Sequence, residues 1–166
     1  MTLGPVLRRG LRQSALQFRP SLAAQQPLFR TAPPTFLRPF SSLKYAKSHE
    51  WLRVEADGTA TIGISDFAQG QLGEIVYCDL PTEGATFDTK EAICVLESVK
   101  AVGQVYAPGK CEVIAANEQL SEQPDLVNSS PEKDGWLLKV KISDEDPELM
   151  DAAAYAKHVE AEGAEH

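Results

Sequence analysis

The feature of this 166-residue chain that most restricts its fold is a series of short apolar runs separated by turn residues. The runs, rich in β-branched residues, are Thr59–Ser65, Glu74–Leu80, Glu91–Leu96, Gly103–Ala107, Cys111–Ala116 and Trp136–Ile142. Between them stand the turn signals Asp57-Gly58, Pro81 with Gly84, Pro108-Gly109 and Asp134-Gly135. Many short strands at regular spacing are typical of a sandwich or barrel, so we expect one mainly β domain over residues 43–166.

Two further segments carry a helical pattern. In Ser65–Gly73, Ser65 or Asp66 can cap a short helix and Gly73 can end it. Near the C-terminus, Asp146-Pro147 reads as an N-cap followed by a first-turn proline. Apolar residues then recur three or four positions apart: Leu149, Ala152, Ala153, Ala156 and Val159. We expect a helix over 147–162 that packs on the β-structure, although Asp151 can equally cap a separate second helix.

Charge is distributed unevenly along the chain. Residues 1–42 hold six arginines, no lysine and no acid, and they are rich in Pro, Ser, Thr and Gln. Subtracting these six charges from the formal net charge of −8 leaves −14 for residues 43–166. An Arg-rich, acid-free start that contains serine is the signature of a mitochondrial transit peptide. We therefore expect residues 1–42 to be a disordered transit peptide, removed in the mitochondrial matrix by cleavage near residues 38–42.

Other roles for the basic residues 1–42 are disfavoured. A basic arm that binds nucleic acid would be joined to a strongly acidic domain, which repels a polyanion. A secretory signal or a membrane span needs a continuous apolar core, which residues 1–42 lack. We expect neither a nucleic-acid partner nor a membrane partner.

Cysteine and histidine positions predict no metal site. The three cysteines, which show no CxxC spacing and read as buried, reduced thiols, are Cys78, Cys94 and Cys111. The three histidines, which lie far from the cysteines and show no ligand spacing, are His49, His158 and His166.

Catalytic patterns are also weak. His49 and Glu50 could form an acid/base pair, but neighbours in an extended segment point to opposite sides. The chain has no Gly-rich phosphate loop and no nucleophile motif of the G-x-S-x-G type. An enzyme that uses these two residues is therefore the disfavoured alternative to a non-catalytic protein.

A single lysine in apolar surroundings is the main candidate for function. Lys100 lies between Val99 and Ala101 in the stretch CVLESVKAVGQVYAP. A lysine that carries a covalent group must be exposed on a rigid mount, and a tight turn between two buried strands provides both. The apolar runs on either side supply such strands, although no Asn-Gly or Asp-Gly pair marks the turn. Amide formation would remove the charge and make the side chain a long flexible arm.

Several stretches resemble the H proteins of the glycine cleavage system, over residues 44–162 in total. The stretches are KSHEWLRVEADGTATIGISDFAQGQLGEIVYCDLP, LESVKA, PDLVNSSPEKDGWLLKVKIS and LMDAAAYAKHV. The resemblance implies a barrel-sandwich hybrid fold of the lipoyl-domain type. It also implies that lipoate is bound covalently to Lys100, within a modification motif formed by Glu97, Ser98, Val99 and Ala101.

The resemblance further implies partners for the lipoyl arm. In this family the arm carries the aminomethyl group of glycine from glycine decarboxylase (P protein) to the aminomethyltransferase (T protein). Dihydrolipoamide dehydrogenase (L protein) then receives electrons, and a lipoyl-attaching enzyme loads the lysine. The family docks the arm in a cleft, and the matching residues here are Ser48, His49 and Glu50. A carboxylate such as Glu50 suits a cationic amine, because charge-assisted hydrogen bonds are stronger than neutral ones.

Three positions depart from the family pattern. Gln104, four residues after Lys100, replaces an acid, so this arm-docking position can make only a neutral contact. Lys90 replaces a turn glycine. Cys111 replaces a second glycine, and Gly109 stands two positions earlier, so we expect a shifted turn in which Gly109 supplies a positive φ.

Two other carrier functions are compatible with an exposed lysine on a hairpin. One is a relay protein that hands lipoyl groups to other acceptors. The other is a biotin-type carrier, which is disfavoured because no methionine stands beside Lys100.

Overall fold

A computed structural model describes residues 42–164 of the chain. The expected transit peptide therefore lies outside the described residues, except for Ser42, which opens the first strand. The strands are β1 (Ser42–Tyr45), β2 (Glu50–Val54), β3 (Thr59–Ile64), β4 (Ile75–Asp79), β5 (Thr86–Phe87), β6 (Ala92–Ser98), β7 (Val102–Tyr106), β8 (Gly109–Ala116) and β9 (Leu138–Glu145). The helices are α1 (Asp66–Leu72), a 3₁₀ helix (Glu118–Ser121), α2 (Leu126–Ser129) and α3 (Ala152–Gly163).

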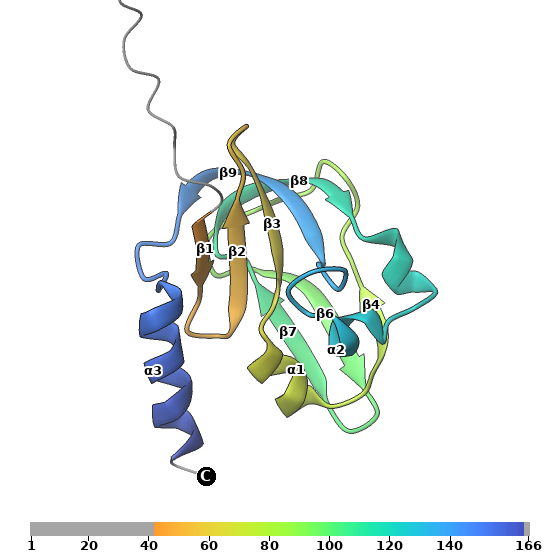
Figure 1. The fold of residues 1–166 in the computed structure, drawn as a ribbon. Coiled ribbons are helices and arrows are strands. Elements are labelled where there is room, and N and C mark those ends of the chain that lie inside the picture. The colour runs from red at the N-terminus through yellow and green to blue at the C-terminus, as the bar shows by residue number, and fades with distance from the viewer. Residues whose placement is uncertain (1–41, 165–166) are drawn as a thin grey trace, which may run out of the picture. The chain divides into compact units, whose positions relative to one another are not determined.

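The described strands form two antiparallel sheets (Figure 1). One has six strands in the order β1-β2-β3-β9-β8-β5, and the other has three in the order β4-β6-β7. The inner faces of both sheets meet in one core, which includes Leu52, Ile62, Leu96, Val105 and Val140. The mainly β fold that the strand pattern predicts is confirmed, and its two packed sheets match a lipoyl-type barrel-sandwich.

The short helix α1 follows its sequence signals closely. Ser65 is the N-cap, and its hydroxyl accepts a hydrogen bond from the Ala68 N–H. Gly73 ends the helix with a φ of 82°, a conformation that suits glycine. The expected helix over Ser65–Gly73 is confirmed.

The C-terminal helix begins later than the expected residue 147. Asp151 is its N-cap and accepts a hydrogen bond from the Ala154 N–H, so the alternative start is the correct one. The Asp146 side chain does accept from the Glu148 N–H, as a cap would, but it closes only a turn, and it also pairs with Lys90. Residues 146–151 therefore form a turn rather than a first helical turn. No helix within residues 42–164 has the length and hydropathy that a membrane crossing requires.

Three strands escaped the sequence pattern. β1 and β2 are short and contain charged residues, and the turn between them carries no glycine: His49 itself adopts a φ of 74°. β5 has only two residues. The expected positive φ at Gly109 is wrong. Gly109 lies in β8, where a Cβ would come within 2.3 Å of the Asp144 carbonyl oxygen, so the glycine serves close strand packing.

Candidate functional site

Lys100 lies at the tip of the hairpin that joins β6 to β7. The Ser98 N–H donates to the Ala101 carbonyl at 2.8 Å. The Ser98 hydroxyl oxygen accepts from the Ala101 N–H at 2.9 Å and from the Lys100 N–H at 3.3 Å. The serine side chain thus supplies the turn contacts that an Asn-Gly pair would otherwise make. This is why the turn was not evident from its sequence.

A neighbouring segment fixes the hairpin in place. The Val99 N–H donates to the Glu74 carbonyl just before β4. The Lys100 side chain lies against Gly73, where a Cβ would come within 2.9 Å of the Lys100 Cε atom. Asn128 on α2 donates to the Gly73 carbonyl at 2.8 Å and accepts from the Ile75 N–H at 2.8 Å. Gly73 and Asn128 therefore support the hairpin tip, a role that sequence reasoning missed.

The predicted modification motif presents an accessible surface. Glu97, Val99, Lys100 and Ala101 are exposed, and only Ser98 is half-buried. Val99 is 73 % exposed and Val102 is 68 % exposed, which is high for apolar side chains. An enzyme can therefore reach the amine and contact the apolar residues beside it.

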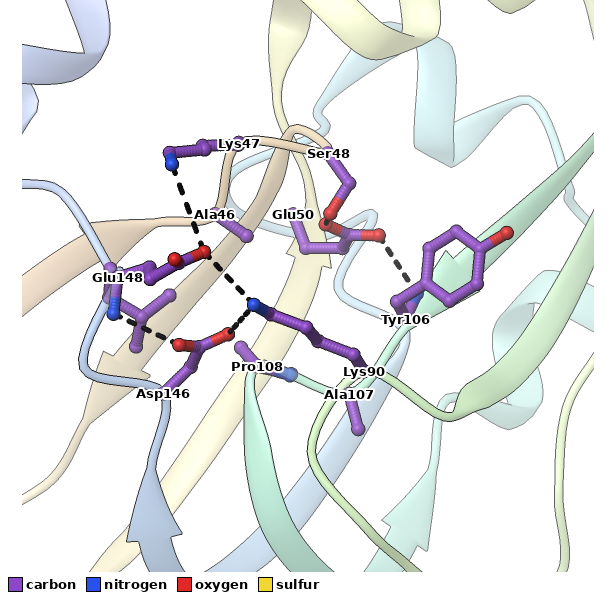
Figure 2. A pocket seen from close by; sticks show the side chains of 11 residues that line it. Ala46, Lys47, Ser48, Glu50, Lys90, Tyr106, Ala107, Pro108, Asp146 and Glu148 are labelled. Carbon is purple, nitrogen blue, oxygen red and sulfur yellow. Dashed lines mark hydrogen bonds and ion pairs between the residues drawn. The ribbon is translucent and has the colours of Figure 1, made fainter.

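A pocket of about 250 Å³ lies beside Tyr106, the last residue of β7, at the opposite end of that strand from Lys100 (Figure 2). Its lining comes from four separate segments: Ala46, Lys47, Ser48 and Glu50; Lys90; Tyr106, Ala107 and Pro108; Asp146, Glu148 and Leu149. Of the four predicted arm-docking residues, Ser48 and Glu50 line this pocket. Sequence reasoning missed the residues from the last two segments, because only the fold brings them together.

Glu50 is 1 % exposed and lies at the wall of the pocket. One carboxylate oxygen accepts from the Ser48 hydroxyl at 2.5 Å, and the other accepts from the Tyr106 N–H at 2.8 Å. These two donors fix the carboxylate, and each oxygen keeps a further lone pair for a donor in the pocket.

Lys90 brings a positive charge into the same pocket. Its φ of 65° is the left-handed conformation expected for a turn glycine, which agrees with the family pattern. Its ammonium group donates to Glu148 at 2.9 Å and lies 3.5 Å from Asp146 (Figure 2). The hydrogen bond to Glu148 and the charge of Asp146 raise the pKa of Lys90.

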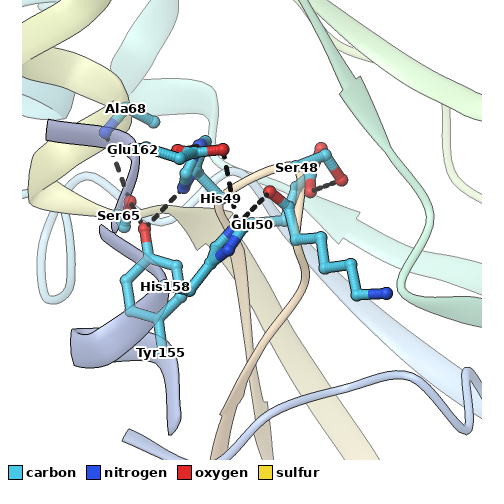
Figure 3. Close-up of polar contacts among 9 residues, drawn as sticks. Ser48, His49, Glu50, Ser65, Ala68, Tyr155, His158 and Glu162 are labelled. Atoms are coloured by element: carbon cyan, nitrogen blue, oxygen red, sulfur yellow. Dashed lines mark hydrogen bonds and ion pairs between the residues drawn. The ribbon is translucent and has the colours of Figure 1, made fainter. Parts of the chain in front are cut away.

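Two of the predicted arm-docking residues lie outside the lining. The Gln104 side chain is exposed on β7 and accepts from the Tyr106 hydroxyl at 3.0 Å, so it lies between the hairpin tip and the pocket. His49, in the turn just before β2, points toward Tyr155 and Glu162 instead (Figure 3). That direction agrees with the argument against a His49–Glu50 acid/base pair.

The cysteines are not candidates for nucleophilic chemistry. All three are free and buried. Burial raises the pKa of the Cys78 thiol to about 11 and also raises that of Cys94. Since the thiolate is the reactive form, these residues act as small apolar side chains.

Comparison with known proteins gives a consistent result. The family model described as Glycine cleavage H-protein matches residues 43–162. A glycine cleavage system H protein from Marinobacter nauticus is 54 % identical over 124 residues, which span 74 % of this chain and 95 % of the relative. A protein of the same name from Klebsiella pneumoniae is 51 % identical, over 74 % and 96 % respectively. The crystal structure of a glycine cleavage system H protein from Mycobacterium marinum aligns with a TM-score of 0.66 and 29 % identity, over 70 % of this chain and 94 % of that one.

Proposed function

Because the chain belongs to the glycine cleavage H-protein family, whose members are lipoyl carriers of glycine cleavage, we propose that Lys100 is the residue that bears its lipoyl group. The observation that carries the proposal is the position of Lys100 at an exposed, hydrogen-bonded hairpin tip within the E-S-V-K-A motif. When bound, a lipoyl group supplies disulfide redox and group-transfer chemistry.

The surroundings of Lys100 fit an attached arm. The amine is exposed, so an attaching enzyme can reach it, and the Ser98 contacts keep the mount rigid. The glycine at position 73 leaves room beside the lysine stem. From this tip, β7 extends to Tyr106 at the pocket, and the four steps from Val102 to Tyr106 correspond to about 13 Å of strand.

The pocket is suited to hold the end of a loaded arm. Glu50 would accept a hydrogen bond from a cationic amine, and Ser48 holds that carboxylate in position. The charged groups in the lining are two lysines and three carboxylates, which leave a formal charge of −1. Lys90 is balanced by Asp146 and Glu148, so its charge does not cancel that of Glu50. Gln104 would add a neutral contact on the path along β7.

The proposed partners follow from the family. They are glycine decarboxylase, the aminomethyltransferase, dihydrolipoamide dehydrogenase and a lipoyl-attaching enzyme. The protein itself would be a non-catalytic carrier: its thiols are held protonated, and Glu50 and His49 face opposite ways. The Arg-rich, acid-free residues 1–42 support import into the mitochondrial matrix.

Mass mapping of the protein isolated from its own cells tests the attachment site. We expect the lipoyl mass on the peptide that contains Lys100, and a biotin mass would instead support the biotin-type carrier. A lipoyl mass on Lys90 or Lys110 would contradict the assignment. Reconstitution with the three glycine-cleavage enzymes then separates the two lipoyl functions, because a relay protein alone would support no glycine turnover.

N-terminal sequencing of the same sample tests the location. We expect the mature protein to begin between Ser41 and Lys44, since the transit-peptide signature ends there. A mature protein that retains Arg8 would exclude removal of the segment.

A further inference from the structure

We propose that His49, His158 and Glu162 form a binding site for a divalent transition-metal ion. The types of donor atom favour Zn²⁺, and the bound ion would link α3 to the β1–β2 turn. One ligand atom from each residue lies within 4.8 Å of the others. Two imidazoles and one carboxylate are a donor set that zinc accepts, with a further position for a fourth ligand. Spacing along the chain does not show this site, because only the fold brings residue 49 to residues 158 and 162.

The separations between donor atoms are close to those of a coordinated ion. His49 Nε2 lies 3.0 Å from one Glu162 oxygen, and His158 Nε2 lies 3.5 Å from the other. Ligands at about 2.0–2.1 Å from a tetrahedral zinc ion stand about 3.3–3.4 Å apart. The two measured separations run to different oxygens of Glu162 and the three ligand atoms lie within 4.8 Å of one another, so the side chains would draw together around an ion.

The backbone presents the three side chains from two elements (Figure 3). His158 and Glu162 stand four residues apart on α3, which places them on one face of the helix. The turn that carries His49 is fixed by hydrogen bonds from the His49 N–H to the Ala46 carbonyl and from the Ser65 N–H to the His49 carbonyl.

The ring of His49 is oriented as metal-binding imidazoles are. Its Nδ1 lies 2.9 Å from the Tyr155 hydroxyl, which in turn lies 2.6 Å from the Ser65 hydroxyl. If Tyr155 donates to Ser65, it accepts the Nδ1 proton of His49, and Nε2 is left with a lone pair that faces Glu162. In that tautomer the Nε2 lone pair and the Glu162 oxygen, 3.0 Å apart, can bind one cation between them, whereas in the other tautomer Nε2–H donates to Glu162. A partner on the second ring nitrogen is the usual companion of a coordinated histidine.

The Lys47 carbonyl lies close enough to serve as a fourth donor. The Lys47 carbonyl oxygen lies 3.1 Å from His158 Nε2, where it accepts a hydrogen bond if that nitrogen carries a proton. When an ion replaces that proton, the carbonyl oxygen or a water molecule can complete the coordination. The side chains of His49, His158 and Glu162 are 18 %, 26 % and 39 % exposed, so an ion can enter from solvent.

The site would strengthen the attachment of the last helix. Residues before α3 are joined to β1 by the reciprocal Tyr45–Met150 backbone hydrogen bonds, and Tyr155 stacks on Tyr45 with ring centroids 4.3 Å apart. After Tyr155, α3 contacts the β1–β2 turn through the Glu162–His49 pair and through His158, which lies 3.1 Å from the Lys47 carbonyl oxygen. A metal ion there would hold the final turns of the helix.

Calorimetric titration of the full chain with Zn²⁺ tests the proposal. The protein should carry Lys100→Arg, so that no lipoyl thiols can bind zinc, and should first be treated with chelator. Residues 1–41 contain no histidine, cysteine or acid that could compete. We expect one ion per chain, a tetrahedral absorption spectrum with Co²⁺, and a rise in melting temperature of about 10 °C at a hundredfold excess of zinc over Kd.

Matched variants on α3 locate the ion. His158→Gln and Glu162→Gln should each weaken zinc binding at least tenfold and abolish the zinc-dependent rise in melting temperature. The control Glu160→Gln removes an exposed carboxylate from the same helix and should bind zinc as the parent does. Circular dichroism checks that both site variants are folded. Equal zinc affinity in all four proteins, or no heat of binding in the parent, would overturn the proposal and leave the cluster as an ion-paired helix contact.

Discussion

The two ends of β7 differ in how their functional groups are held. At its start, the Lys100 hairpin takes its shape from four consecutive residues and leaves the amine exposed. Near its end, the Tyr106 N–H donates to Glu50 in a pocket built from four segments, where the carboxylate is almost wholly buried. The Lys100 end is suited to modification by another enzyme, whereas the Glu50 pocket is suited to enclose the group at the end of an attached arm.

The difference implies that attachment and protection can be separated by substitution. The proposed attachment would depend on a local motif, residues 98–101, whose hydrogen bonds to one another include no residue of the pocket lining. Protection depends on the register of β2, β7 and β9 and on residues up to position 149. Changes at one end should therefore leave the other end intact, and the following predictions test that independence.

The largest effect is expected from Lys100→Arg. Arginine keeps the charge but has no amine that can be acylated, so lipoylation should be lost completely. Since Lys100 is exposed, the melting temperature should stay within about 1 °C of the parent. Intact mass and thermal denaturation measure the two outcomes, with Lys110→Arg as control. Residual lipoyl mass on Lys100→Arg would place the attachment elsewhere.

Changes at Glu50 should act on protection alone. A buried carboxylate paired with a cationic amine contributes on the order of 1.5–3 kcal/mol, which is about tenfold to a hundredfold in docked population. Glu50→Gln should therefore speed the loss of ammonia from the loaded carrier about tenfold or more, while Lys100 is still lipoylated. Gln104→Glu should slow that loss.

Decay of the loaded protein, followed by mass spectrometry, measures these rates. Glu55→Gln is the control, because that carboxylate is exposed on the β2–β3 turn outside the pocket. Superimposable decay curves for all proteins would mean that the pocket protects by excluding water only.

Gly73→Ala should lower stability without preventing attachment. Gly73 has φ 82° and ψ −156°, a region that only glycine populates readily, so the substitution should cost about 1–3 kcal/mol. The new Cβ would also displace the Lys100 stem, which is flexible enough to move. Gly70→Ala is the matched control: it has no close neighbour and should raise stability by up to about 1 kcal/mol. Urea denaturation measures the free energy of unfolding of each variant. An unchanged free energy of unfolding in Gly73→Ala would refute the argument from the backbone conformation.

The smallest effect is expected from salt. The −14 charge of residues 43–166 predicts partners with basic surfaces around their lipoyl entrances. Screening over about 8 Å at physiological ionic strength should then lower the association rate with the decarboxylase several-fold between low and moderate salt. Stopped-flow measurement at sub-saturating carrier tests this. An association rate that does not change with salt would mean that the acidic residues serve only to keep the protein soluble.

Sequence reasoning succeeded where the signal was local. Ser65 and Gly73 delimit α1, and the apolar runs correspond to β3, β4, β6, β7, β8 and β9. It failed where distant segments meet. The local sequence predicts a helix cap at Asp146, but it carries no sign of the Lys90 pairing, which joins two loops that are far apart in the chain. The family resemblance predicts arm docking at His49 as well as at Glu50, whereas the His49 ring contacts Tyr155 and Glu162 of α3 and does not line the pocket.

The ion pairs of Lys90 have a consequence for chemical selectivity among the lysines. Acylation requires a neutral amine, and the contacts with Glu148 and Asp146 raise the pKa of Lys90. The raised pKa leaves a smaller fraction of Lys90 as the neutral, nucleophilic amine. Lys100 has no ion pair among the residues that the structure describes, and the exposed Val99 stands beside it in the sequence. An acylating reagent without any protein specificity should thus react with position 100 before position 90.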